Sequence, residues 1–373
     1  MSADSVYLDC AATTMPSEAA LDAFLTASRE CFANPQSVHA AGLKTERLIT
    51  EAAKEISGSL GCDKSELVFT SGGTESNNLA ILGHVPHSMA KHIVTSAAEH
   101  PSVTSPLKVW ADRGVRVDAV KTGRFGVIDL GELEKAISAE TSLVSVIHIN
   151  NETGAVNNIE EIGALVKRKN PKTIFHVDAV QAFCKLDINV PKAKIDLLSI
   201  SSHKINGVKG TGALYVRKGV ILKPLFCGGS QQAKLRPGTE NAAGIRSFAS
   251  AVQKADIEHL RRLNDKLRSG LSGIAGTHIN SPESGFPGIL NVSFPGIRAE
   301  VMVNALSAKG IYISAGAACS AKDNYKTVLM RTGEPKNIYE SSVRISFDGF
   351  NTEADIERLI IALNELIPVL TLR

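Results

Sequence analysis

A lysine follows a strand-like apolar run, inside a turn that is rich in serine and histidine. Lys204 lies in Ser199-Ile-Ser-Ser-His-Lys-Ile-Asn-Gly. A lysine is usually a solvated surface charge. Here, however, Ser201 and His203 are residue types that bind phosphate, and a lysine held near a cationic ring loses its proton more readily, as formation of a Schiff base requires. The segment therefore indicates either a surface lysine or one that attaches a cofactor.

An acidic residue and an amide lie one helical turn apart after another apolar run. His176-Val-Asp-Ala-Val-Gln places Asp178 at the carboxyl end of a buried strand, with Gln181 after it. A carboxylate there needs a cationic partner or a metal, because burying it unpaired is unfavourable. The pyridinium nitrogen of pyridoxal phosphate is such a partner. Capping of the next helix is an equally good interpretation of this segment alone.

Further segments could bring polar groups to the same place. Ser71-Gly-Gly-Thr-Glu-Ser-Asn-Asn opens a helix, and the free N–H groups near Gly73 and Thr74 could hold a phosphate, although the alternative is a plain tight turn. His100 and Asn151 each follow an apolar run. An imidazole can stack on a flat ring and move protons, while a structural histidine is the more common case.

A cysteine lies in a run of small residues, and an arginine lies in a later strand-like run. Cys319 occupies Ser314-Ala-Gly-Ala-Ala-Cys-Ser-Ala-Lys-Asp-Asn-Tyr, which has little to pack and much freedom, as a sulfur-carrying thiol needs. Most unpaired cysteines are buried and inert, and we assign the other five to that class. Arg344, in Ser341-Ser-Val-Arg-Ile-Ser-Phe, could bind a carboxylate with two N–H groups or form a surface ion pair.

The elements that would position these residues alternate along the chain. Short runs rich in valine and isoleucine begin at His92, Leu143, Thr173, Asp196 and Gly212, and segments of helical period lie between them. This alternation predicts an α/β fold with a mainly parallel sheet covered by helices. In such a sheet, ligand sites lie at the carboxyl ends of the strands.

The chain is long enough for a large domain and a smaller one. Residues 243–276 are expected to form one extended helix that leads out of the large domain. We expect the large domain over residues 16–255 and a small α+β domain, formed by residues 1–15 and 256–373, that carries the cysteine loop. The strand-like runs of the small domain begin at Gly288 and Ser342, and its helices are expected over 299–309 and 353–366.

Composition and charge exclude several classes. Of the 373 residues, 43% are hydrophobic and 21% are charged, as in an ordinary globular protein. The formal net charge is +3 and no basic stripe is present, so direct binding of nucleic acid is not expected. The six scattered cysteines contain no C-x-x-C pair and predict neither a metal site nor a disulfide framework. No signal-peptide or membrane-span pattern occurs, so we expect a cytoplasmic protein with no membrane partner.

Taken together, these segments resemble the class I cysteine desulfurases of the NifS and IscS type, which are fold-type I pyridoxal-phosphate enzymes. The resemblance runs from Tyr7-Leu-Asp-Cys-Ala-Ala-Thr-Thr and Asn34-Pro-Gln-Ser-Val-His to Ser342-Val-Arg-Ile-Ser-Phe. It implies a seven-stranded, mainly parallel sheet between helices in the large domain, and pyridoxal 5'-phosphate as cofactor. Ala317 and Val208 depart from the family's pattern, where a serine and a proline are common.

The resemblance also implies a role for each candidate residue. Lys204 would carry the cofactor, His100 would stack on its ring and Asp178 would pair with the ring nitrogen. Gln181 would contact the ring hydroxyl. The residues implied for the phosphate are Gly73, Thr74, Ser201 and His203, with Thr239 contributed by a neighbouring subunit, so a homodimer is implied. The residues implied for the substrate are Asn34, Arg344 and Asn151, and Asn151 would also contact the cofactor.

The activity that the resemblance implies is removal of sulfur from L-cysteine. Its products would be L-alanine and a persulfide on Cys319, which would pass the sulfur to an iron–sulfur scaffold or a tRNA-thiolation enzyme. The implied catalytic residues are Lys204, His100 and Cys319. A selenocysteine lyase, another fold-type I aminotransferase and a non-catalytic sulfur-relay paralogue are the alternatives. A transaminase needs no thiol on a loop, so Cys319 separates desulfuration from that alternative.

Overall fold

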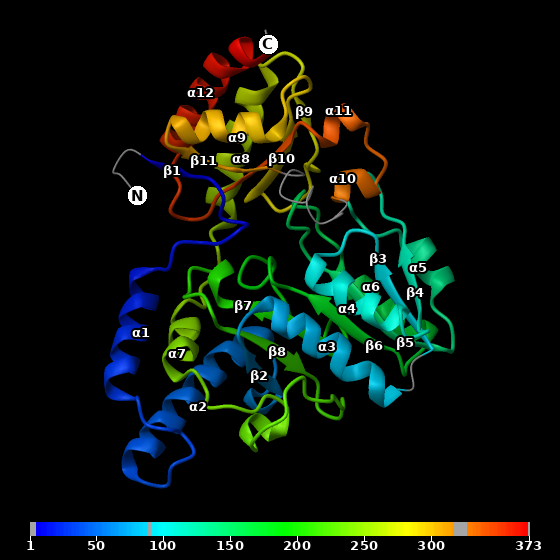
Figure 1. Cartoon of the computed structure of the whole chain (residues 1–373), viewed down its shortest axis with the longest axis vertical. Coiled ribbons are helices and arrows are strands. Elements are labelled where there is room, and N and C mark those ends of the chain that lie inside the picture. The colour runs from blue at the N-terminus through cyan, green and yellow to red at the C-terminus, as the bar shows by residue number, and fades with distance from the viewer. Residues whose placement is uncertain (1–4, 89–90, 316–326, 372–373) are drawn as a thin grey trace.

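The structure is a computed structural model that describes residues 5–88, 91–315 and 327–371. Two parts of the molecule lie one above the other in Figure 1. The lower part contains a seven-stranded sheet, and the upper part contains a four-stranded and a two-stranded sheet. The α/β class and the seven-stranded sheet that the sequence predicts are therefore confirmed.

The seven-stranded sheet is parallel in its centre and antiparallel at one side. Its spatial order is β2-β8-β7-β6-β5-β3-β4. The strands are β2 (Leu67–Thr70), β3 (His92–Ser96), β4 (Arg116–Val120), β5 (Thr141–Ile147), β6 (Ile174–Asp178), β7 (Leu197–Ser201) and β8 (Gly212–Val216). From β7 to β4 all neighbours are parallel, whereas β8 is antiparallel to both β7 and β2. The carboxyl ends of five parallel strands consequently meet at one edge.

Both faces of this sheet are buried, which explains why its strands are apolar without alternation. Ile93, Leu143 and Leu197 belong to one cluster of buried side chains, whereas Val94 and Val144 belong to a second cluster. Successive residues of a strand point to opposite faces, so the two clusters lie on opposite faces of the sheet. Helices complete the packing on each face, as the sequence predicts.

Side-chain caps mark the start of several helices of the lower part. Side chains of Ser17, His39 and Asn158 accept hydrogen bonds from the first turns of three of them, which satisfies N–H groups that lack helical partners. None of the described helices is both long and apolar enough to cross a membrane. The α-helices are α1 (Glu18–Glu30), α2 (Ala40–Leu60), α3 (Gly73–Ser88), α4 (Pro101–Ala111), α5 (Leu130–Ala136), α6 (Ile159–Lys169) and α7 (Ala242–Ser250), and short 3-10 turns cover Lys64–Glu66, Ser202–Lys204 and Gln231–Lys234.

The upper part combines the first strand of the chain with its last third. Strand β1 (Val6–Tyr7) pairs in parallel with β11 (Ile311–Tyr312). The four-stranded sheet has the order β12 (Ser314–Ala315), β13 (Ser342–Ser346), β10 (Ile289–Ser293) and β9 (His278–Ile279). Its helices are α8 (Ile257–Ser272), α9 (Ala299–Ala308), α10 (Val328–Arg331), α11 (Lys336–Tyr339) and α12 (Glu353–Thr371). Here too, strands and helices lie where the apolar runs predict them.

The prediction of one extended helix over residues 243–276 is wrong. Helix α7 ends at Ser250 and α8 begins at Ile257, after a connection that is held by other contacts. In that connection the Ala255 N–H donates to the carbonyl of Cys184 rather than to a helical partner. Asp256 then accepts from the His259 N–H and starts a new helix. The aspartate cap and the tertiary contact override the helical period of this stretch.

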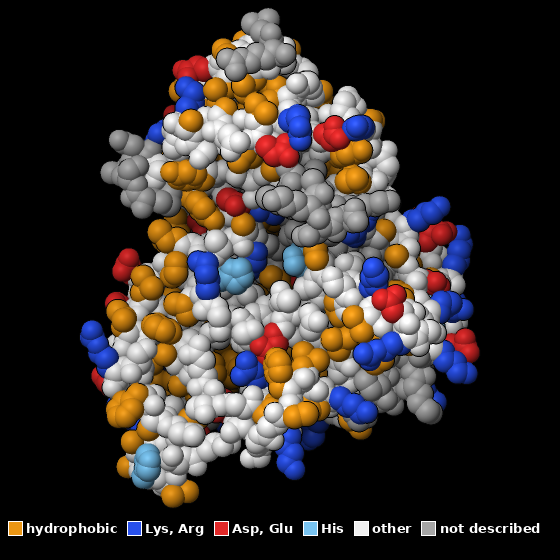
Figure 2. Space-filling model, viewed as in Figure 1, with side chains coloured by type: hydrophobic (Ala, Val, Ile, Leu, Met, Phe, Trp, Pro, Cys, Tyr) orange, Lys and Arg blue, Asp and Glu red, His pale blue; other side chains and the backbone are white. Residues whose placement is uncertain are grey.

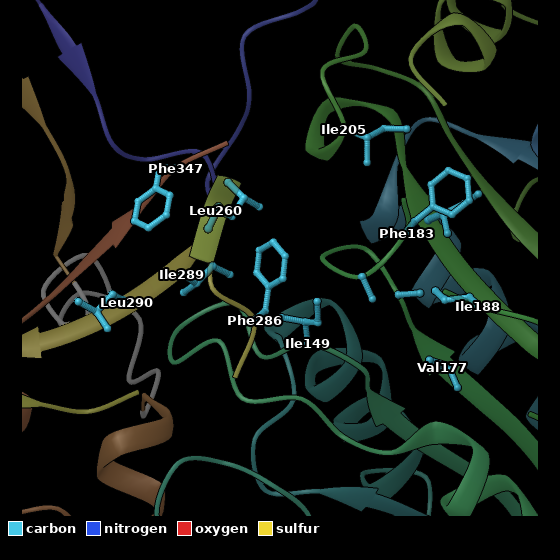
Figure 3. Close-up of a cluster of buried hydrophobic side chains, with 14 of the residues drawn as sticks. Ile149, Val177, Phe183, Ile188, Ile205, Leu260, Phe286, Ile289, Leu290 and Phe347 are labelled. Atoms are coloured by element: carbon cyan, nitrogen blue, oxygen red, sulfur yellow. The ribbon is translucent and has the colours of Figure 1, made fainter. Parts of the chain in front are cut away.

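One buried cluster joins the two parts of the molecule. Figure 3 shows Phe286 between Leu260 and Ile289 of the upper part and Ile149, which follows β5 of the lower part. All four side chains are almost completely buried and belong to the same cluster. The two sheets are therefore held by shared apolar burial, and the site residues at their junction have a common support.

Asp196 ties strands and helix together at the amino end of β7, away from the carboxyl edge. Its carboxylate accepts from the Lys167 ammonium on α6, the Arg217 guanidinium after β8 and the Phe175 N–H on β6. The Asp196 side chain is only 1% exposed. Its charge therefore has to be matched by these donors, because an unmatched buried charge destabilises the fold.

We expect Asp196→Asn to lower the free energy of unfolding by about 3 kcal/mol, because two cations lose their buried partner. Urea unfolding followed by circular dichroism measures the change. Asp187→Asn is the matched control, since Asp187 pairs with Lys254 where both side chains are more than 80% exposed. Equal unfolding midpoints for the two variants would contradict the role assigned to Asp196.

Candidate active site

A cavity of about 380 Å³ lies at the carboxyl edge of the seven-stranded sheet, where the two parts of the molecule meet. Figure 2 shows the surface hollowed between these parts, with histidine and basic side chains in the hollow. Sequence-predicted residues that line the cavity are Gly73, Thr74, His100, Asn151, Asp178, Gln181, His203, Lys204 and Arg344. Residues from segments far apart in the chain thus converge on one space. Among the described residues, no group of three or more His, Cys, Asp or Glu could hold a metal.

Asp178, the last residue of β6, is buried and held by two donors. Its Oδ2 accepts from Asn77 Nδ2 at 2.8 Å, and its Oδ1 accepts from the Val180 N–H at 3.0 Å. Both donors are neutral, so they fix the carboxylate without cancelling its charge. The negative charge remains available to a cationic group in the cavity.

Asn77 and Ser102 were missed by the sequence reasoning. The second Nδ2 hydrogen of Asn77 is donated to Ser102 Oγ at 2.8 Å, and Ser102 Oγ lies 2.8 Å from Nδ1 of His100. Asn77 follows Gly73 by one helical turn, so the pattern Gly-x-x-x-Asn at the start of α3 was the available signal. A polar residue on the sheet-facing side of a helix needs a buried partner, and Asp178 supplies it.

The imidazole of His100 is held in one tautomer. It caps α4, and its Nδ1 accepts from the Ser102 N–H at 3.1 Å. Burial lowers the pKa of His100, and the nearby Lys204 and Arg344 lower it further against the opposing effect of Asp178. A backbone N–H can only donate, so the neutral ring carries its proton on Nε2. His100 therefore offers the cavity a flat neutral ring.

Lys204 lies in the 3-10 turn that follows β7, and its side chain lines the cavity. Its Nζ donates to the carbonyls of Ala11 and Ala12 at 2.6 and 2.7 Å. Burial, and then the charges of Lys185 and Arg344, lower the pKa of Lys204 to about 7. A substantial fraction of the side chain is thus a free amine near neutral pH, the form that can attack an aldehyde.

One end of the cavity is suited to an anion. Gly72 has a φ of +148°, and a Cβ on Gly73 would lie 2.4 Å from Val180 Cγ2, so both positions favour glycine. The first N–H groups of α3 lack helical partners there. Nearby, Ser201 Oγ is buried and has no hydrogen-bond partner among the described residues. An unpaired buried hydroxyl beside a helix N-terminus fits a phosphate.

Arg344 of β13 spans the junction from the upper side. Its guanidinium donates to Asp9 Oδ1 at 2.8 Å, to Ser314 Oγ at 3.1 Å and to the backbone carbonyl of Asn151 at 3.0 Å. Its Nε is buried and has no partner among the described residues. The arginine is positioned by both parts of the molecule, and its side chain lines the cavity, where a guanidinium can bind an anionic group.

Three of the predicted site residues do not line this cavity, and a fourth cannot be placed. Asn34 accepts from the Gln36 N–H within its own loop. Thr239 is exposed, in the segment that follows the 3-10 turn Gln231–Lys234. Ser201 is buried, and its Oγ lies close to Gly72. Cys319 lies outside the described residues. The structure therefore brings the cofactor candidates together and leaves the thiol and the neighbouring-subunit contact as predictions.

Comparisons with known proteins identify the family of this chain. A family model described as Aminotransferase class-V matches residues 6–359. The Cysteine desulfurase IscS of Methanosarcina thermophila is 38% identical over 97% of this chain and 92% of its own length. The mitochondrial cysteine desulfurase of Saccharomyces cerevisiae is 39% identical over 98% of this chain and 75% of its own length. A solved structure described as a NifS-like protein has a TM-score of 0.92 and 35% identity, and the match covers 98% of this chain and 100% of that one.

Fold and cavity define a pyridoxal-phosphate-dependent enzyme of fold type I. The chain belongs to the class-V aminotransferase family and, within it, to the cysteine desulfurases of the NifS and IscS type. The residues in and beside the cavity fit the cofactor: Asp178 would pair with a cationic ring nitrogen, the start of α3 with the nearby Ser201 hydroxyl would hold a phosphate, and the Lys204 amine would react with an aldehyde. When bound, pyridoxal phosphate takes up the electron pair that is released at the α-carbon of an amino acid.

The lowered pKa of Lys204 predicts an unusual reactivity in the cofactor-free protein. Only an unprotonated amine reacts with limiting acetic anhydride, so acetylation of Lys204 should be lost as the pH falls through about 7. Lys254, which is exposed and paired with Asp187, has a raised pKa and is the control. As the pH rises, acetylation of Lys254 should continue to increase at pH values where acetylation of Lys204 is already constant. Peptide mass spectrometry measures both, and parallel profiles for the two lysines would contradict the electrostatics described here.

Proposed function

We propose that this chain removes sulfur from free L-cysteine and gives L-alanine, with Cys319 as the first sulfur acceptor. The observation that carries the proposal is the convergence of a free-amine lysine, a buried carboxylate and an arginine donor in one cavity, in a member of this family. Lys204 and Asp178 suit the cofactor, and Arg344 suits an amino acid carboxylate.

Each chemical step has a residue to perform it. The Arg344 guanidinium would bind the substrate carboxylate and so orient the α-carbon in the cavity. The Lys204 amine would take the α-proton, since its lowered pKa lets it accept and return a proton near neutral pH. The Cys319 thiolate would attack the substrate sulfur. A sulfur–sulfur bond then forms and the carbon–sulfur bond breaks, and the carbon receives a proton to become the methyl group of alanine.

The remaining cavity residues would hold the cofactor. We assign His100 to stacking on the ring, because its neutral, oriented imidazole has a flat face, and Gln181 to the ring hydroxyl. Asn151 borders both cofactor and substrate, and Asn34 is assigned to the substrate in agreement with the family resemblance. The residues assigned to the phosphate are Gly73, Thr74, Ser201 and His203.

A homodimer would complete the phosphate site, with Thr239 of the partner subunit. The Thr239 segment is anchored beside the phosphate end of its own chain, because Arg236 pairs with Glu75 in the first turn of α3 at 2.9 Å. Thr239 itself is exposed and does not line the cavity of its own chain. Phe32 and Val38 are 81% and 93% exposed, as expected of an apolar surface that a second subunit covers.

The organisation around the reaction follows the same proposal. Residues 16–255 would form the cofactor-binding domain, and residues 1–15 and 256–373 would form the domain that carries Cys319. The persulfide would be passed to a protein acceptor, which we propose to be an iron–sulfur scaffold or a tRNA-thiolation enzyme in the cytoplasm. The alternatives of a selenocysteine lyase or a transaminase are not favoured by the comparisons.

Alanine and sulfide measured together test the function. With L-cysteine and a reductant, the wild type should release the two products in equal amounts. Cys319→Ala should abolish both while the absorbance of the bound cofactor is retained, because the sulfur loses its acceptor. Cys227→Ala, which removes an exposed cysteine, is the control and should retain turnover. Undiminished sulfide release from the Cys319 variant would contradict the persulfide step.

Arg344→Lys tests carboxylate binding. We expect KM for L-cysteine to rise at least tenfold, since the ammonium cannot reproduce the fork of the guanidinium. The cofactor absorbance should be unchanged. Lys336→Arg, in an exposed pair with Glu340, is a control of the same kind of exchange and should leave KM unaltered. A fall in kcat at constant KM would place Arg344 outside the substrate site.

A further inference from the structure

A second lysine lies beside the site and has no role in the mechanism above. Lys185 lies four residues after Gln181 in the turn that follows β6, and its Nζ donates to Gln181 Oε1 at 3.1 Å. The ammonium also lies 5.5 Å from the centroid of the Phe286 ring. Neither the neutral amide nor the aromatic ring cancels its charge. A lysine enclosed in this way is unusual and calls for an explanation.

Lys185 borders a second cavity of about 260 Å³ on the other side of Lys204. Both lysines line this cavity, together with Cys10, Phe286 and Asp348. Lys204 and Ala11 belong to the walls of both cavities and so separate them. Lys185 therefore lies behind the nucleophile, on the side opposite the proposed cofactor.

A short chain of hydrogen bonds joins the two lysines. An ammonium can only donate, so the atom of Gln181 that faces Lys185 has to be the carbonyl oxygen. The amide nitrogen of Gln181 is thereby turned the other way and donates to the Ala11 carbonyl at 2.7 Å. The same carbonyl accepts from Lys204 Nζ at 2.6 Å. Lys185 thus fixes which end of the Gln181 amide faces the cofactor cavity.

The charges that face the two lysines are few and can be named. Burial lowers the pKa of Lys185 to about 8; Cys10, Asp348 and Cys184 raise it and Arg344 lowers it. At Lys204, Lys185 is the first of the two charges that lower the pKa, Arg344 is the second, and Asp9 and Asp178 act in the opposite direction. Removal of the Lys185 charge therefore takes away the larger of the two cationic influences on Lys204.

We propose that Lys185 is a positioning residue for the cofactor site: its hydrogen bond orients the Gln181 amide, and it places a positive charge behind Lys204. The inference rests on the proposed function in one respect, that Lys204 carries the cofactor. It does not depend on cysteine being the substrate. Lys185 acts from behind the site and touches no reacting atom.

The test is a pH titration of the holoenzyme's cofactor absorbance, without cysteine. Lys185→Met removes the charge and keeps a side chain of similar volume. The midpoint of the titration should then move up by roughly one pH unit, because the charge of Lys185 no longer opposes protonation of the Lys204 nitrogen. Lys185→Arg keeps a charge and should restore the midpoint. Lys254→Met, at the exposed rim of the same cavity, is the matched control and should leave it in place.

Each outcome has a defined meaning. A midpoint in Lys185→Met that equals that of the wild type, or an equal shift in the methionine and arginine variants, overturns the inference and leaves the proposed function intact. A wild type whose absorbance shows no bound cofactor overturns both. Should the methionine variant not fold, as judged by its thermal midpoint, Lys185→Arg and Lys185→Gln carry the comparison, and the glutamine variant alone should shift.

Discussion

A carboxylate that is buried at the end of a central strand has to be paired, and the arrangement of this site follows from that requirement. Asp178 has two neutral donors, Asn77 and the Val180 N–H, which hold its oxygens but leave its charge in place. The cations that face the cavity, Lys204 and Arg344, come from other elements and are themselves deprived of water. The charge state of each group therefore depends on the others. A cationic ring that enters the cavity would balance the charge of Asp178.

The junction between the two sheets makes this balance possible. Asp9, from the segment after β1, pairs with Arg344 of β13, and the same guanidinium holds the backbone of Asn151 after β5. Lys204, in turn, donates to the carbonyls of Ala11 and Ala12. The N-terminal segment thus runs through the site and connects Lys204 with Arg344. Movement of the upper part would alter both ends of the cavity together.

Much of this arrangement follows from the sequence, because parallel strands bring their carboxyl ends to one edge. That rule places Asp178, Lys204 and His100 together from apolar runs alone. The rule says nothing of the supporting residues. The Gly-x-x-x-Asn pattern marks Asn77 as a polar residue one helical turn after Gly73, but only the packing of α3 on the sheet shows its contact with Asp178. Lys185 likewise resembles a surface lysine in the sequence. Its enclosure depends on Phe286, which lies more than 100 positions later in the chain and packs against it in the fold.

Borohydride reduction of the holoenzyme, followed by peptide mapping, identifies the amine that carries the cofactor. Reduction locks the cofactor onto whichever amine carries it. We expect the label on the peptide that contains Lys204, and we expect Lys204→Ala protein to bind the cofactor without becoming labelled. A label on Lys185, or no labelled peptide from coloured wild-type protein, would contradict the assignment of the nucleophile and the geometry built around it.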